Sequence, residues 1–172
     1  MRQNRWYVFI LIVLCVTMRI AIAQPPAAFH FVAPLSGDEE VPPVDTNATG
    51  FAYFQLEDND ELDFTLIVFN IENITQAHIH CGAAGVNGPV VAFLFGPDPA
   101  GVTVNGILSE GTITAADIIP RPDSPECPDG VANFDDLIAK MRSGDTYANV
   151  HTLDNPGGEI RGQIRGVGRR TR

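Results

Sequence analysis

Glycine and proline interrupt this chain so often that only short regular segments fit between them. Its 172 residues include 16 glycines and 13 prolines. The intervening segments are rich in β-branched and aromatic residues, which is typical of an all-β sandwich. No repeat of solenoid period is visible. The pattern predicts one antiparallel β-sandwich domain with strands at 29–34, 50–57, 61–71, 74–81, 89–95, 106–114, 147–153 and 158–164.

Two local patterns add detail to these strands. Segment 61–71 alternates apolar and polar residues, as a half-buried strand does. The turn residues 58–60 precede it, so it is expected to form a hairpin with the strand before it. The strand that starts at Gly106 is expected to continue through 115–118. Segment 120–130, with four prolines, is expected to be irregular.

One short helix is predicted near 133–142. Asn133 is a favourable N-cap, and Gly144 provides a stop after the last turn. Acidic residues lie in the first turn and basic residues in the last, as the helix dipole favours. The residues expected to face the core are Leu137, Ile138 and Met141.

The first 23 residues have the pattern of a secretory signal peptide. Arg2 and Arg5 precede an apolar stretch at 6–16, and Ala21-Ile22-Ala23 has the form of a cleavage site. The mature chain is therefore expected to start near Gln24 and to be secreted, periplasmic or extracellular. The alternative is an uncleaved anchor. The apolar stretch is short for a span of about 20 residues, and no other stretch is long enough.

The charge of the chain limits its partners. The formal net charge is −10, and all acidic residues follow the signal segment. This argues against nucleic acid or an anionic membrane as partner and favours cations. The end of the chain is locally basic from Arg161 onward. It is interpreted as a strand followed by a solvated tail at 167–172.

Two cysteines, Cys81 and Cys127, remain after the signal segment. In an oxidising compartment such a pair is expected to form a disulfide. The alternative is that Cys81, next to His80, is a soft metal ligand. Neighbouring residues on a strand point to opposite faces, which favours the disulfide.

Three of the four histidines, His78, His80 and His151, suggest a metal site. His78 and His80 are two residues apart, so on one strand both imidazoles point to the same side. If the strand of His151 lies alongside, three neutral nitrogens can converge, which suits zinc or copper. The alternative is that they are polar residues near strand ends. His30, between two phenylalanines, is interpreted as structural.

Two carboxylates are secondary candidates for this site. Glu40 and Glu159 could ligate the metal or accept an imidazole N–H. The pair Glu39-Glu40 itself is interpreted as a solvated edge rather than a catalytic dyad. Elsewhere no nucleophile elbow, phosphate-binding loop or dinucleotide fingerprint is present, so the residues indicate no particular reaction.

Six stretches of the chain form a recognisable pattern: 35–44 (LSGDEEVPPV), 50–52 (GFA), 77–80 (AHIH), 88–91 (GPVV), 147–152 (YANVHT) and 156–164 (PGGEIRGQI). They resemble the chordin-type (CHRD) domain family, and the match covers nearly the whole mature chain. Residues 24–166 are thus expected to form one such domain. The cysteine-rich growth-factor-binding modules of chordin have no counterpart, so growth-factor antagonism is not implied.

The resemblance implies an immunoglobulin-like or Cu,Zn-superoxide-dismutase-like antiparallel β-sandwich. The family pattern contains the positions of His78, His80 and His151, which favours a copper or zinc site. The dismutases' bridging histidine and zinc-loop cluster are not found in this chain. Three functions follow: an exported metal-binding protein, a non-enzymatic extracellular module that meets a protein or polysaccharide, and a dismutase-like oxidoreductase. Whether the protein is an enzyme stays open.

Overall fold

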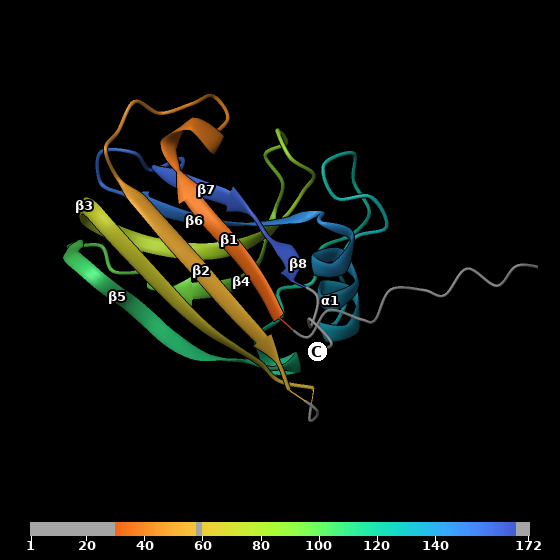
Figure 1. Cartoon of the computed structure of the whole chain (residues 1–172). Helices are drawn as coiled ribbons and strands as arrows, with labels where there is room; N and C mark the ends of the chain where they lie inside the picture. The colour runs from red at the N-terminus through yellow and green to blue at the C-terminus, as the bar shows by residue number, and fades with distance from the viewer. Residues whose placement is uncertain (1–29, 58–59, 168–172) are drawn as a thin grey trace, which may run out of the picture.

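The chain folds into antiparallel strands with one α-helix, which confirms the predicted all-β class (Figure 1). The computed structural model describes residues 30–57 and 60–167. The predicted signal peptide at 1–23, turn residues 58–59 and tail residues 168–172 lie outside this range. The elements are β1 (His30–Ser36), η1 (Gly37–Glu39), β2 (Thr49–Leu56), β3 (Leu62–Cys81), β4 (Val90–Phe95), β5 (Val102–Ile113), η2 (Ala115–Asp117), α1 (Phe134–Ser143), β6 (Thr146–Thr152), β7 (Ile160–Gln163) and β8 (Arg165–Val167).

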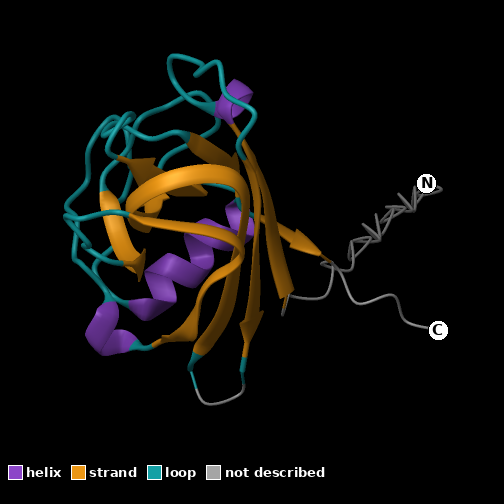
Figure 2. Cartoon of the chain, turned by 90° about the vertical axis from the view of Figure 1, so that its left-hand side faces the viewer, coloured by secondary structure: helices purple, strands orange, loops and turns teal. Residues whose placement is uncertain are grey.

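The strands form two layers that share β3 (Figures 1 and 2). One layer contains β1, β2, the first half of β3 and β5, and the other contains β7, β6, the second half of β3 and β4. β8 adds to β1. Because β1 also pairs with β7, the hydrogen-bonded path closes on itself. The structure is therefore a sandwich whose layers are joined into one closed sheet.

The strands predicted at 61–71 and 74–81 are wrong as separate elements, because β3 runs through both. Asn70 and Asn73 adopt left-handed backbone angles, with φ of 54° and 53°. The pairing with β5 shifts register on either side of Ile71. Such irregularities bend a strand without ending it. Asn70 and Asn73 thus mark a bend within β3 and not its end.

Two boundaries near β5 also differ from the prediction. β5 starts at Val102, four residues before the expected Gly106. The expected extension through 115–118 is wrong, because η2 replaces it. The Thr114 hydroxyl accepts a hydrogen bond from the Ala116 N–H, and the Asp117 carboxylate accepts one from the Thr114 N–H. This capping box turns the chain.

Helix α1 confirms its predicted signals. The Asn133 side chain accepts the Asp136 N–H at 3.0 Å. Gly144 adopts a left-handed conformation with φ of 81° after the last turn, which glycine does without steric penalty. The three side chains expected to face the core, Leu137, Ile138 and Met141, are buried.

Cys81 and Cys127 form the predicted disulfide, with Cα atoms 5.4 Å apart. Both residues are fully buried. The bond ties the end of β3 to the segment at 120–130, which is irregular as expected apart from one bridge between Arg121 and Val131. It therefore fixes the chain directly after His80.

Candidate metal centre

One face of β3, β6 and β7 carries most of the buried polar side chains among the described residues. His78 lies opposite Asn149 in the pairing of β3 with β6, and His80 lies opposite Tyr147. Opposite residues of an antiparallel pair point to the same side. We call this surface the histidine face. Its residues are Gln76, His78, His80, Tyr147, Asn149, His151, Arg161 and Gln163.

The histidine face is polar yet largely buried. His78, His80 and His151 are only 3%, 8% and 6% exposed. Connecting loops cover them: the carbonyls of Gly88 and Pro156 reach the histidines, and Asn87 bonds to the carbonyl of Val41 at 2.7 Å. Loops that precede and follow the strands therefore enclose the site.

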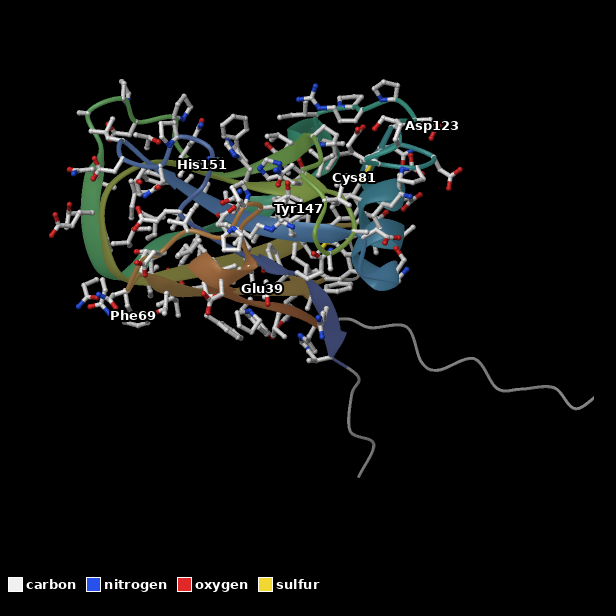
Figure 3. All side chains as sticks on the ribbon, turned by 90° about the horizontal axis from the view of Figure 1, so that it is seen from above. Glu39, Phe69, Cys81, Asp123, Tyr147 and His151 are labelled. Carbon is white, nitrogen blue, oxygen red and sulfur yellow. A yellow bond between two sulfur atoms is a disulfide. The ribbon has the colours of Figure 1, made fainter. Side chains whose placement is uncertain are left out.

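The structure brings the three predicted histidines together. His78 Nδ1 lies 3.1 Å from His151 Nε2. The ring centroids of His78 and His80 are 5.5 Å apart, and those of His80 and His151 are 5.9 Å apart. Figure 3 shows His151 and Tyr147 along β6, with Cys81 farther toward the helix. Two adjacent strands thus supply one cluster, as their register requires.

Backbone carbonyls fix the tautomers of two of these rings. His80 Nδ1–H donates to the Gly88 carbonyl at 2.9 Å, and His151 Nδ1–H donates to the Pro156 carbonyl at 3.0 Å. In the neutral rings Nε2 is then the unprotonated nitrogen of both. His78 Nδ1–H accordingly donates to His151 Nε2. Each ring carries a lone pair on Nε2, the form that a metal ligand needs.

The cluster fits a transition-metal ion. Nε2 of both His78 and His80 is buried without a hydrogen-bond partner among the described residues. Buried polar atoms normally have a partner, so such atoms call for an explanation. The three ligand atoms lie within 4.8 Å of one another. Nitrogens about 2 Å from one zinc or copper lie about 3–4 Å apart, so the rings would have to turn toward a common point to bind one ion.

Burial keeps all three imidazoles neutral. It lowers the pKa of His78 to about 3, with further lowering by His151 and His80. It lowers the pKa of His80 to about 4, although the Gly88 carbonyl opposes this. The pKa of His151 is lowered for the same reason. At neutral pH the lone pairs therefore remain available to a metal without loss of a proton.

The metal-free protein is expected to lose stability as the pH falls below about 6.5. An unfolded histidine gains a proton near that pH, whereas folded His78 and His80 do so only near 3 and 4. The unfolded state therefore binds more protons in this window, and the free energy of unfolding falls by up to about 1.4 kcal/mol per pH unit for each histidine. Urea titrations from pH 7.5 to 4 measure the slope.

Glu40 changes the free energy of unfolding with pH in the opposite direction. Burial raises its pKa from 4.5 to about 7, so between these values the folded state binds the additional proton. Replacing Glu40 by glutamine should therefore steepen the loss of stability between pH 6.5 and 4.5. A free energy of unfolding that is flat across this range in both proteins would contradict the neutral, buried histidines.

A stack of three side chains supports His80. The Tyr147 ring lies parallel to the His80 ring, with centroids 4.8 Å apart. The guanidinium of Arg161, which lies on β7, is 4.2 Å from the centroid of the Tyr147 ring. The Tyr147 hydroxyl accepts the Gly88 N–H at 3.1 Å. Gly88 thus contacts both His80 and Tyr147 through its backbone, and the stack holds the imidazole in place.

Arg161 was not predicted as part of the site. It lies within the strand predicted at 158–164, and its side chain is only 2% exposed. Its Nη1 donates to Asn87 Oδ1 at 2.8 Å. The signal in the sequence is its place between Ile160 and Gly162 in a predicted strand. Arg161 alternates with the inward-facing Ile160 and so belongs to the histidine face.

The two secondary carboxylates occupy different places. Glu159 accepts hydrogen bonds from the hydroxyls of Thr46 at 2.8 Å and Thr152 at 2.7 Å. Glu40 is only 5% exposed, so its interpretation as part of a solvated edge is wrong. Because η1 turns the chain, Glu39 is the one residue of this acidic pair that stays exposed. Among residues 30–57 and 60–167, the ligand atoms brought together are those of the three histidines.

The fourth histidine lies apart from the cluster. His30 is on β1, where its Nδ1 lies 2.8 Å from the Tyr53 hydroxyl. The two rings stack with centroids 5.9 Å apart. This partner is consistent with the structural role expected for His30.

Comparison with known proteins gives one match. A family model for the CHRD domain matches residues 31–164, which is most of the chain. No curated protein and no solved structure matches. Within the part of the chain that the structure describes, no helix is long and apolar enough to cross a membrane.

Proposed function

Since the chain belongs to the CHRD domain family, an extracellular type of domain, we propose that it is an exported protein that binds zinc or copper through His78, His80 and His151. The observation that carries the proposal is the pair of buried Nε2 atoms without partners, on His78 and His80. A divalent metal ion would give both atoms a partner and would replace the bond between His78 and His151. Export rests on the signal-like pattern at 1–23.

The ligand chemistry favours zinc or copper over harder ions. Imidazole nitrogen suits both metals, whereas calcium and magnesium take oxygen ligands. Cys81 and Cys127 are bonded to each other, so neither supplies a thiolate. Three neutral nitrogens also leave a coordination position for water or another ligand, as in catalytic zinc sites.

Metal analysis of the exported protein tests this proposal. The full chain is expressed without a histidine tag, recovered from the medium or periplasm, loaded with zinc or copper(II) and dialysed. Its mass should correspond to a start near Gln24. We expect about one ion per chain and, at a free metal concentration of 100 times Kd, stabilisation by about 2.7 kcal/mol.

Two histidine variants make the test specific. His78→Ala should retain almost no metal, because it removes one of three ligands. His30→Ala should bind like the wild type, because His30 pairs with Tyr53 outside the site. Equal metal content in the His78→Ala and wild-type proteins, or none in the wild type, would refute the proposed site.

A second candidate function is a non-enzymatic interaction module for an extracellular protein or polysaccharide. It is favoured by an apolar row across the outer side of the other layer, in which Pro34 pairs with Phe51, Phe51 with Ile67 and Ile67 with Ile107. Phe51 is 37% exposed and Ile107 is 55% exposed. A melting temperature that does not respond to zinc or copper would favour this function.

A further inference from the structure

A carboxyl group is enclosed beside the histidine cluster. Glu40 directly follows η1 and is only 5% exposed, and its Oε1 is buried without a hydrogen-bond partner among the described residues. An acidic side chain is almost never buried in this way unless a cation or several donors compensate it. The nearby Arg161 and the Val41 N–H compensate Glu40 only in part, because burial still raises its pKa.

Glu40 reaches the histidine face at Asn149. A Cβ atom added to Gly158 would lie 2.6 Å from both amide atoms of Asn149 and 2.7 Å from Glu40 Oε1. Both side chains therefore lie against the side of Gly158 where another residue would carry its Cβ atom. Asn149 is paired with His78 and also has a buried oxygen, Oδ1, without a partner. Two unpartnered oxygens thus lie around Gly158, and one of them belongs to Asn149, the cross-strand neighbour of His78.

The charges around this space require an anion once a metal ion is bound. The three imidazoles are neutral, and Arg161 already buries a positive charge against Tyr147. A divalent ion would add two further positive charges in surroundings of low dielectric constant. Such a charge is costly unless a carboxylate lies close to it.

Glu40 is the carboxyl group that remains for this role. Glu159 is held by two threonine hydroxyls and is not among the buried residues. In the part of the chain that the structure describes, Glu40 is the one buried acidic side chain. Burial raises its pKa to about 7 despite the nearby Arg161, and a cation close by would favour its ionised form.

We infer that Glu40 determines the charge of the ion that this site accepts. Its carboxylate compensates the second positive charge of zinc(II) or copper(II), so the site prefers a divalent ion to copper(I). The inference rests on the proposed metal site and adds a specificity-determining residue to it. Glu40 acts next to the ligands, through Asn149 or through a water on the metal, rather than as one of the three nitrogen donors.

Affinity measurements with two ions of different charge test this inference. Kd values for zinc(II), and for copper(I) under anaerobic conditions, are obtained by competition with chromogenic chelators. We expect Glu40→Gln to weaken zinc(II) binding about 10–100-fold, the range found for residues that support metal ligands. Copper(I) binding should weaken only about 3–10-fold, the square root of the zinc(II) factor, because the Coulomb energy of a single charge is half as large. Glu39→Gln, at the exposed neighbour, should change neither.

The outcomes separate this inference from the metal site itself. Equal weakening of both ions by Glu40→Gln would assign Glu40 a structural role and overturn the inference, as would unchanged zinc(II) binding. Glu40→Asp, which keeps the charge, should retain more zinc(II) affinity than Glu40→Gln; the reverse order would also overturn it. A wild-type protein that binds neither ion would refute the metal site, and the role of Glu40 with it.

Discussion

Replacing Cys81 and Cys127 by alanine is expected to lower the free energy of unfolding by about 4 kcal/mol. The disulfide closes a loop with a sequence separation of 46 residues, and a loop of this length restricts the unfolded chain by about that amount in the loop-entropy description. In a domain of this size the melting temperature should fall by roughly 10–15 °C. Urea unfolding followed by circular dichroism measures the change.

A reducing agent provides the matched control for the disulfide. Dithiothreitol should destabilise the wild-type protein toward the level of the double variant and should leave the double variant unchanged. The variant should also bind metal more weakly, because Cys81 follows His80 directly on β3. A loss of less than about 1 kcal/mol in the double variant would show that other contacts hold the segment at 120–130.

Replacing Gly88 by alanine is expected to lower the free energy of unfolding by at least as much as loss of the disulfide does. It should also weaken metal binding. The added Cβ would lie 1.6 Å from the carbonyl oxygen of Cys81, a backbone atom that cannot move without shifting β3. Gly88 also accepts the His80 N–H at 2.9 Å and donates to Tyr147 at 3.1 Å. A substitution that forces the backbone to shift and breaks buried hydrogen bonds costs about 4–5 kcal/mol.

Gly157→Ala is the matched control for Gly88→Ala. A Cβ on Gly157 meets no atom within 4 Å, and the residue has no positive φ. Its effect on the free energy of unfolding should stay within about 0.5 kcal/mol. The two variants are compared by denaturant titration and by zinc affinity. Unchanged stability of Gly88→Ala would mean that the loop at 82–89 can move away from β3.

The sequence predicted the elements best where one local signal dominates. The cap at Asn133 and the glycine at 144 defined the helix, because both act within one turn of the chain. The alternation of apolar residues located most strands. The continuity of β3 through Asn70 and Asn73 was missed, because a bulge and a turn use the same residues, and only pairing with neighbouring strands decides between them.

The candidate site was predictable where it depends on strand geometry. The spacing of His78 and His80 defines a shared face, and His151 joins them because β6 pairs with β3. The positions of Glu40 and Gly88 were not predictable in this way, since loops bring them to the cluster and loop paths depend on the completed fold. Arg161 was predictable in principle from strand alternation, because it lies in the strand predicted at 158–164.

The length of β3 ties the two layers into one cooperative unit. Its 20 residues pair with β2 and β5 along the first half and with β4 and β6 along the second. Neither layer can open without removing partners from a strand that the other layer also needs. Amide protons of β3 should therefore exchange with solvent only through global unfolding. A metal ion bound at His78 and His80 would consequently slow exchange across the whole domain, including strands that lie far from the ion.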